Sequence, residues 1–216
     1  MSKKKPKIGT CSICGNRNVK LTKDHVPPQT IFLSPHPDNM IDVPACDTCN
    51  GGSSILDQRF GVYVAMHCAP FHESAKKLFL FNTLATLNEN KKLHRTIKTG
   101  LQPAHITYAN GDVDTNASIL QWDSVSFDSV IERTVRGLYW KHYKTILGNN
   151  AIVEVQFHNK IPDKFISLSS PFHQNQIGYD GEVIYKYLRD ENNPFFSIWV
   201  LQFYYSLFAA GITKPK

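Results

Sequence analysis

The segments Cys11-Ser12-Ile13-Cys14, Lys23-Asp24-His25-Val26-Pro27-Pro28 and Cys46-Asp47-Thr48-Cys49-Asn50 decide the fold of this chain. Four of the five cysteines lie in two Cys-x-x-Cys pairs, and a gap of two residues lets both sulfur atoms of a pair turn toward one ion. Four thiolates form the ligand set of a closed tetrahedral zinc site. We therefore expect Cys11, Cys14, Cys46 and Cys49 to hold a structural Zn²⁺. The fifth cysteine, Cys68, is expected to be a small buried hydrophobe.

An acidic residue and a histidine lie between the two cysteine pairs. The intervening segment runs from Gly15 to Ala45, longer than a simple zinc ribbon needs, and it carries Asp24 and His25. Asn50 follows the last of the four cysteines directly. In one interpretation these residues have no chemistry, because Asp-His pairs are common on exposed loops and an asparagine often only caps a helix. In the other, they form a second, oxygen-liganded metal site that does the chemistry.

In this order the motifs resemble those of the HNH endonuclease family, in its zinc-stabilised form with a ββα-metal, treble-clef-like core. The resemblance covers residues 11 to about 57. The matching segments are Cys11-x-x-Cys14, Leu21-Thr22-Lys23-Asp24-His25-Val26-Pro27 and Val43-Pro44-Ala45-Cys46-x-x-Cys49-Asn50. The resemblance implies a phosphodiester hydrolase acting on DNA, with His25 as general base and a catalytic Mg²⁺ or Mn²⁺ held by Asp24 and Asn50. It also implies products with 5′-phosphate and 3′-hydroxyl ends.

The chain departs from the family pattern at two positions. Nine residues before the final asparagine, where many members carry an asparagine that orients the histidine loop, this chain has Ile41. Asn39, Asp42 or a backbone carbonyl could hold His25 instead. Four residues after Asn50, where many members carry lysine or histidine, this chain has Ser54. Asp57 could complete the metal shell, or it could only offset the dipole of the helix on which it lies.

The composition shift near residue 56 predicts a small module followed by a larger domain. We expect residues 1–66 to form the zinc-stapled HNH module and residues 67–216 an α+β accessory domain with helices and antiparallel strands, for substrate or partner binding. The expected helices cover residues 55–66, 73–88 and 126–147, with a hairpin around Asn110-Gly111 and strands at 152–157 and 182–187. The apolar run from Phe195 to Ile212 favours a buried strand over a membrane span.

The charge of the chain suits a polyanionic partner. The net charge is +6 and the isoelectric point about 9.0, although many soluble proteins are this basic. On the helix at 126–147, one side carries Arg133, Arg136, Lys141 and Lys144, which could follow a phosphate backbone or form a solvated basic face. His142 lies among apolar positions and is expected to be a core histidine.

The expected partner is DNA, with RNA left open. No secretory signal or membrane segment is visible, and cysteines placed for metal rather than disulfides favour the cytoplasm. A homodimer or a partner protein of a defence system is a further expectation. Two competing functions remain: a non-catalytic zinc module that binds nucleic acid or protein, and a nuclease subunit that is active only within a larger defence complex.

Overall fold

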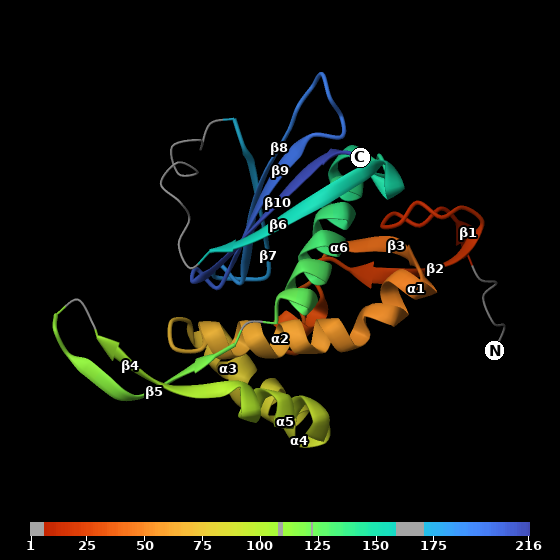
Figure 1. Ribbon diagram of the computed structural model, residues 1–216. Helices are drawn as coiled ribbons and strands as arrows, with labels where there is room; N and C mark the ends of the chain where they lie inside the picture. The colour runs from red at the N-terminus through yellow and green to blue at the C-terminus, as the bar shows by residue number, and fades with distance from the viewer. Residues whose placement is uncertain (1–6, 108–109, 122, 159–170) are drawn as a thin grey trace.

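The N-terminal part of the chain is a small antiparallel sheet followed by a helix (Figure 1). The computed structural model describes residues 7–107, 110–121, 123–158 and 171–216. Strands β1 (Lys7–Gly9), β2 (Val19–His25) and β3 (Asp42–Cys46) pair in that order. In the register of β2 with β3, His25 lies opposite Asp42 and Leu21 lies opposite Cys46. This pairing brings the second cysteine pair back to the first.

Two helices follow β3. The short α1 (Asp47–Asn50) is joined by the 3-10 turn η2 (Gly51–Ser53) to α2 (Ser54–Cys68), which confirms the helix expected at 55–66. Ser53 occupies the N-cap of α2, where its hydroxyl donates to Asn50 O at 2.7 Å. The middle of α2 is buried on all sides, so α2 is a core helix of the molecule rather than a surface helix.

A helical run and a hairpin lie below α2 in Figure 1. Helices α3 (Glu73–Leu78) and α4 (Leu84–Glu89) are joined by the π turn η3 (Phe79–Thr83), which confirms the helical run expected at 73–88. Helix α5 (Lys91–Gly100) was not expected. Strands β4 (Leu101–Thr107) and β5 (Val113–Leu120) form the expected hairpin, which projects from the rest of the molecule.

Helix α6 (Ser124–Tyr143) lies between the N-terminal sheet and the C-terminal sheet. It begins two residues before the expected start because Asp123 caps it, accepting from Ser126 N at 3.2 Å. It ends four residues before the expected end because Lys144 adopts a left-handed conformation with φ of 52°. The 3-10 turn η4 (Gly148–Asn150) follows. Phe127, Ile131, Val135 and Leu138 are fully buried on α6.

The C-terminal half is a five-stranded antiparallel sheet in the order β6-β10-β9-β8-β7. Its strands are β6 (Ala151–His158), β7 (His173–Ile177), β8 (Val183–Arg189), β9 (Ser197–Phe203) and β10 (Leu207–Pro215). The strands expected at 152–157 and 182–187 are confirmed. The apolar run from Phe195 holds β9 and the first part of β10, which turn at Tyr204 and Tyr205 through left-handed conformations. Among the described residues, no helix has the length and apolar character needed to cross a membrane.

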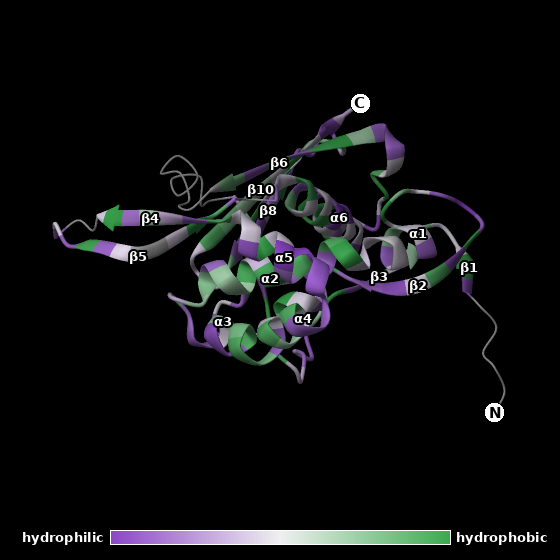
Figure 2. Ribbon diagram, turned by 60° about the horizontal axis from the view of Figure 1, so that its bottom comes forward, coloured by the Kyte–Doolittle hydropathy of each residue, from purple (hydrophilic) through white to green (hydrophobic). Residues whose placement is uncertain are grey.

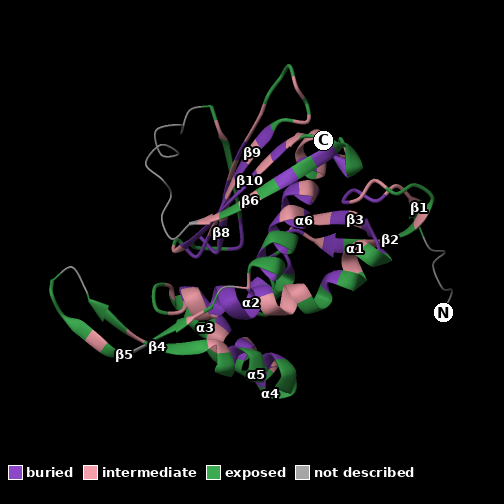
Figure 3. Ribbon diagram, in the orientation of Figure 1, coloured by how far each residue is buried: buried purple, intermediate pink, exposed green. Residues whose placement is uncertain are grey.

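One buried core joins both halves of the chain. The cluster of buried apolar residues runs from Cys11 to Ala209 and includes side chains of α2, α6 and both larger sheets (Figure 3). The expected boundary between residues 66 and 67 lies inside α2, two residues before the helix ends. The structure is therefore a mixed α+β protein in which the cysteine-rich segment rests against the remainder.

Candidate functional site

The four cysteines of the two pairs meet at one point. The sulfur atoms of Cys11, Cys14, Cys46 and Cys49 all lie within 4.8 Å of one another, and those of Cys14 and Cys46 are 3.8 Å apart. A tetrahedral zinc with Zn–S bonds of about 2.3 Å places its sulfur ligands about 3.8 Å apart. The cluster can therefore hold a metal ion such as zinc. Cys68 lies apart from it, buried against Phe203 O at 3.8 Å.

The environment of the cluster favours a thiolate. The pKa of Cys11 is lowered to about 4, chiefly because the Cys49 thiol donates a hydrogen bond to its sulfur. The Cys46 amide adds a second donor at 3.3 Å. The same contact raises the pKa of Cys49, and burial raises the pKa of Cys14. Because thiolates are the form that binds metal, the cluster already stabilises one ligand in its reactive state.

Asp24, His25 and Asn50 line one cleft, of about 230 Å³. Asp24 and His25 are the last two residues of β2, and Asn50 ends α1. Asp57, in the first turn of α2, lines the same cleft. The folded hairpin and the start of α2 thus bring together three residues that the sequence singled out as a possible site, together with the carboxylate left open there.

Asn50 is fixed by hydrogen bonds to β2. Its amide nitrogen donates to Lys23 O at 2.7 Å and to Thr22 Oγ1 at 2.9 Å. Because the nitrogen makes both contacts, the side-chain oxygen is left for another partner. Asn50 therefore also holds the end of α1 against the strand that carries Asp24.

His25 is supported by Asp42, which lies opposite it on β3. His25 Nδ1 is 2.8 Å from Asp42 Oδ1, a contact that meets the distance of an ion pair but not the angles of a hydrogen bond. Asp42 Oδ2 accepts from Lys23 Nζ at 2.9 Å. Of the three supports considered for His25, the structure has Asp42. Asn39 instead bonds to Gln176 O and to Gly178 N, near β7.

Arg133 is buried between the carboxylates of Asp24 and Asp57. Only 6% of the residue is exposed; its Nη2 pairs with Asp57 and its Nε lies 3.5 Å from Asp24 Oδ2. Burial raises the pKa of Asp24 to about 6, against the lowering effect of the Arg133 charge, and burial also raises the pKa of Asp57. Arg133 therefore acts as an internal counter-ion beneath the cleft.

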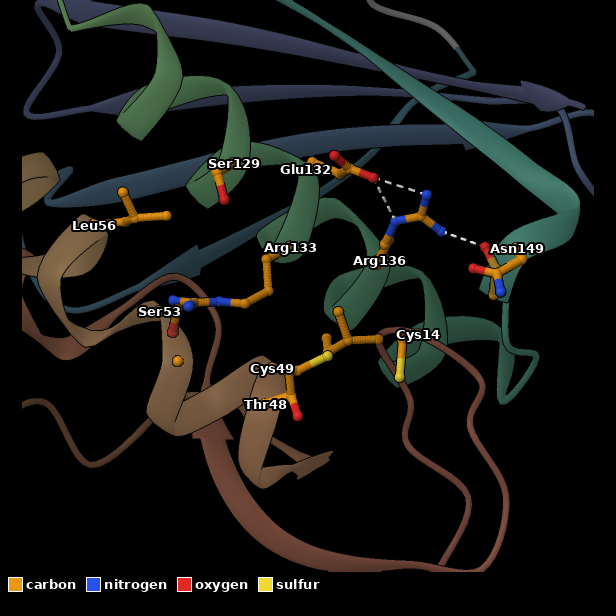
Figure 4. Close-up of a pocket in the computed structure, with 13 residues that line it drawn as sticks. Cys14, Thr48, Cys49, Ser53, Leu56, Ser129, Glu132, Arg133, Arg136 and Asn149 are labelled. Atoms are coloured by element: carbon orange, nitrogen blue, oxygen red, sulfur yellow. Dashed lines mark hydrogen bonds and ion pairs between the residues drawn. The ribbon is translucent and has the colours of Figure 1, made fainter.

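The basic face expected on α6 is corrected for Arg133 and Arg136 by these contacts. Arg133 points into the protein, and Arg136 is held by Glu132 and by the carbonyl oxygens of Gly148 at 2.6 Å and Ala151 at 3.0 Å. Both arginines line a separate hollow of about 320 Å³ beside the cysteines (Figure 4). Of the four basic residues expected on this face, only Lys141 and Lys144 are exposed, because α6 is enclosed by the core along most of its length.

Two supporting residues were missed or left open by the sequence. Arg133 follows Ile131 and precedes Val135, both fully buried, so its place in an apolar stretch is a signal that it points inward. Asp42 was one of three alternatives, and only the strand register decides among them.

No protein-family model, no curated protein and no solved structure matches this chain. The chemistry of the cysteine cluster and of the cleft has to be inferred from their own residues.

Proposed function

We propose that this chain is a metal-dependent HNH endonuclease that hydrolyses DNA phosphodiester bonds. In this proposal β2, β3 and the helix that follows form a ββα-metal core stapled by the four-cysteine zinc. The observation that carries the proposal is that Asp24 and His25, at the end of β2, and Asn50, at the end of α1, line a single cleft. A cysteine cluster that served only as a staple would have no reason to combine an acid, a histidine and an amide at this place.

His25 is the general base of the proposed reaction. The neutral imidazole of a histidine has one ring nitrogen without a proton, which can accept a proton from the attacking water. Asp42 Oδ1, 2.8 Å from Nδ1, favours the proton on that nitrogen and leaves Nε2 as the acceptor. The same carboxylate stabilises the imidazolium that forms when Nε2 takes the proton.

Asp24 and Asn50 supply oxygen atoms for a divalent cation. Asp24 Oδ2 is buried and has no hydrogen-bond partner among the described residues, which fits an additional positive neighbour. Hard oxygen donors favour Mg²⁺ or Mn²⁺ over zinc at this second site. A bound divalent cation would polarise the phosphoryl group and stabilise the leaving 3′ oxygen. Asp57 is a third oxygen donor in the same cleft.

The test is a plasmid-nicking assay with Mg²⁺ or Mn²⁺. Wild type is expected to convert supercoiled plasmid, and His25→Ala to lose at least about a hundredfold in rate, the low end of a general-base contribution. Asp42→Asn should show an intermediate loss. His105→Ala, which changes an exposed histidine on β4, is the matched control and should cut like wild type.

Two results would overturn the proposal. One is equal cutting by wild type and His25→Ala. The other is a folded, metal-loaded wild type that cuts no duplex, branched or single-stranded DNA and no RNA. The second result would favour the non-catalytic zinc module. Cutting that begins only when a partner protein is added would favour a subunit of a larger defence complex.

A further inference from the structure

A second groove adjoins the cleft. A second hollow of about 190 Å³ shares Gln29 and Thr30 with the cleft and extends between α2 and α4. Its wall includes Gln58 from α2 and Asn82 and Thr86 from the helical run. No aspartate, glutamate, lysine or arginine lines it. The path leading away from Asp24 and His25 therefore mixes polar side chains with Phe32 and Val62, and it carries no carboxylate that would repel a polyanion.

The start of α5 is hydrogen-bonded to two residues that line the groove. Gln58 Oε1, in the groove wall, accepts a hydrogen bond from the Asn90 side chain at 2.6 Å, and Thr86 O accepts from Asn90 N at 2.8 Å. Asn90 is the N-cap of α5, because its side-chain oxygen accepts from Leu93 N. The first turn of α5 is thus hydrogen-bonded to Gln58, the residue that follows Asp57 on α2.

Helix α5 presents a basic face without counter-ions. Leu93 and Ile97 are buried, and the outward positions are Lys91, Lys92, His94, Arg95 and Lys98. The helix contains no acidic residue, and none of its lysines or its arginine forms an ion pair within the described part of the chain. By contrast, Arg59, Arg133 and Arg136 are all paired. In Figure 2, α5 lies on the face turned toward the viewer, beside α2 and α4.

We propose that α5 is a backbone-binding helix for DNA, and that it holds the strand whose scissile phosphate lies in the Asp24–His25 cleft. The placement of the scissile phosphate rests on the proposed nuclease function; the binding of DNA by α5 does not. Lys91 and Lys98 are about 10 Å apart along the helix axis, about three steps of 3.4 Å along one DNA strand. The exposed positions of α5 itself are all polar or charged, with no apolar anchor of the kind a protein partner would bury, which favours a polyanionic backbone.

The experiment compares two double variants that remove the same charge. Lys92→Gln/Arg95→Gln changes α5, and Lys141→Gln/Lys144→Gln changes the exposed end of α6. Each is placed in a His25→Ala background, so that binding is measured without cleavage. The probe is a labelled 30-base-pair duplex, titrated by fluorescence anisotropy over a series of salt concentrations. Circular dichroism establishes that each variant is folded.

The α5 variant is expected to weaken binding on the order of tenfold at low salt. The slope of log K against log salt should also become shallower by about 0.9 for each phosphate contact removed. The α6 variant should keep the slope of its parent. In proteins that retain His25, the α5 replacements should raise KM for plasmid cutting and leave kcat little changed.

Equal losses in the two variants would overturn the proposal, because net charge alone would then explain binding. An unchanged slope in the α5 variant would overturn it as well. If His25→Ala cuts as fast as wild type but the α5 variant still loses its slope, the nuclease proposal fails and DNA binding by α5 stands. Retention of an acidic protein with no binding to the duplex would assign α5 to a protein partner instead.

Discussion

At the scale of single residues, Arg133 decides the electrostatics beneath the cleft. Its guanidinium lies between Asp24 on β2 and Asp57 on α2, and all three side chains are largely withdrawn from water. A buried charge without a partner is costly, so each of the three depends on the other two. Arg133 thereby ties α6 to the two elements that form the cleft.

Replacing Arg133 by methionine tests this dependence. We expect Arg133→Met to lower the free energy of unfolding by about 3 kcal/mol, because it leaves two carboxylates buried without a cation. Urea denaturation measures the change. Arg59→Met is the control, since Arg59 pairs with Asp123 at 3.5 Å and both side chains are partly exposed. It should cost less than about 1 kcal/mol, and an equal cost in both variants would contradict the role given to Arg133.

The residues that could be predicted were those whose positions follow from local chain geometry. Asp24, His25 and Asn50 lie close to the two cysteine pairs in sequence, so a metal staple and one hairpin are enough to bring them together. Arg133 is 76 positions from Asp57, and no local pattern specifies that contact. Its charge predicted an exposed face, whereas its partners are visible only after the chain has folded.

At the scale of elements, the β2–β3 hairpin and α1 depend on the cysteine cluster. The 3-stranded sheet is small, and β1 has only 3 residues, so its own core is slight. The four cysteines connect the loop after β1 to the end of β3 and to α1. A metal bound there would contribute its binding free energy to folding.

Removing one thiolate tests the staple. Cys46→Ser is expected to release zinc and to unfold the N-terminal sheet, because three thiolates no longer close a tetrahedral site. Elemental analysis gives the zinc content and near-ultraviolet circular dichroism reports the loss of packing. Cys68→Ala, a cysteine outside the cluster, should leave the zinc content unchanged. Full zinc content in Cys46→Ser would refute the four-cysteine site.

The elements themselves were predictable to different degrees. The periodic apolar positions of residues 126–147 predicted α6. Helix α2 has no such period, because its middle is buried on all sides, and it was predicted from the turn residues before it and the proline after it. Helix α5 was missed, since only Leu93 and Ile97 are buried in a segment otherwise made of polar residues. The ends of α6 were misplaced because several serines and aspartates compete for its N-cap, and Asp123 rather than Ser126 occupies it.

At the scale of the whole molecule, α6 joins the cysteine-rich half to the C-terminal sheet through a cluster of aromatic rings. His142, near the end of α6, contacts the hydroxyl groups of Tyr185 and Tyr187 at 3.0 and 2.9 Å. Tyr187 stacks on Trp199 with 4.9 Å between ring centroids. Burial, followed by the charges of Lys141, His173 and Lys144, lowers the pKa of His142 to about 4.

The lowered pKa makes stability depend on pH. The unfolded chain protonates His142 near pH 6.5, whereas the folded protein resists protonation until about pH 4. The contribution of neutral His142 to the free energy of unfolding is therefore complete above pH 6.5 and is lost as the pH falls from 6.5 to about 4. Between pH 7 and pH 4, the free energy of unfolding should fall by about 2 kcal/mol less in His142→Gln than in wild type; this figure allows for the partial exposure of His142. Urea denaturation across this range measures it, and His105→Gln should follow wild type.

The contact between α6 and β2 also limits which sequences can adopt this arrangement. A Cβ atom placed on Gly137 would lie 2.7 Å from Val26 Cγ1 and 3.0 Å from Cγ2, closer than side chains normally approach. Val26 follows His25 directly, so any side chain at position 137 would displace the strand end that carries the histidine. If position 137 were randomised and variants were selected for the properly built cleft, glycine alone should survive. The shape of the cleft thus depends on Gly137, a helix residue without a side chain that lies more than a hundred positions away from His25.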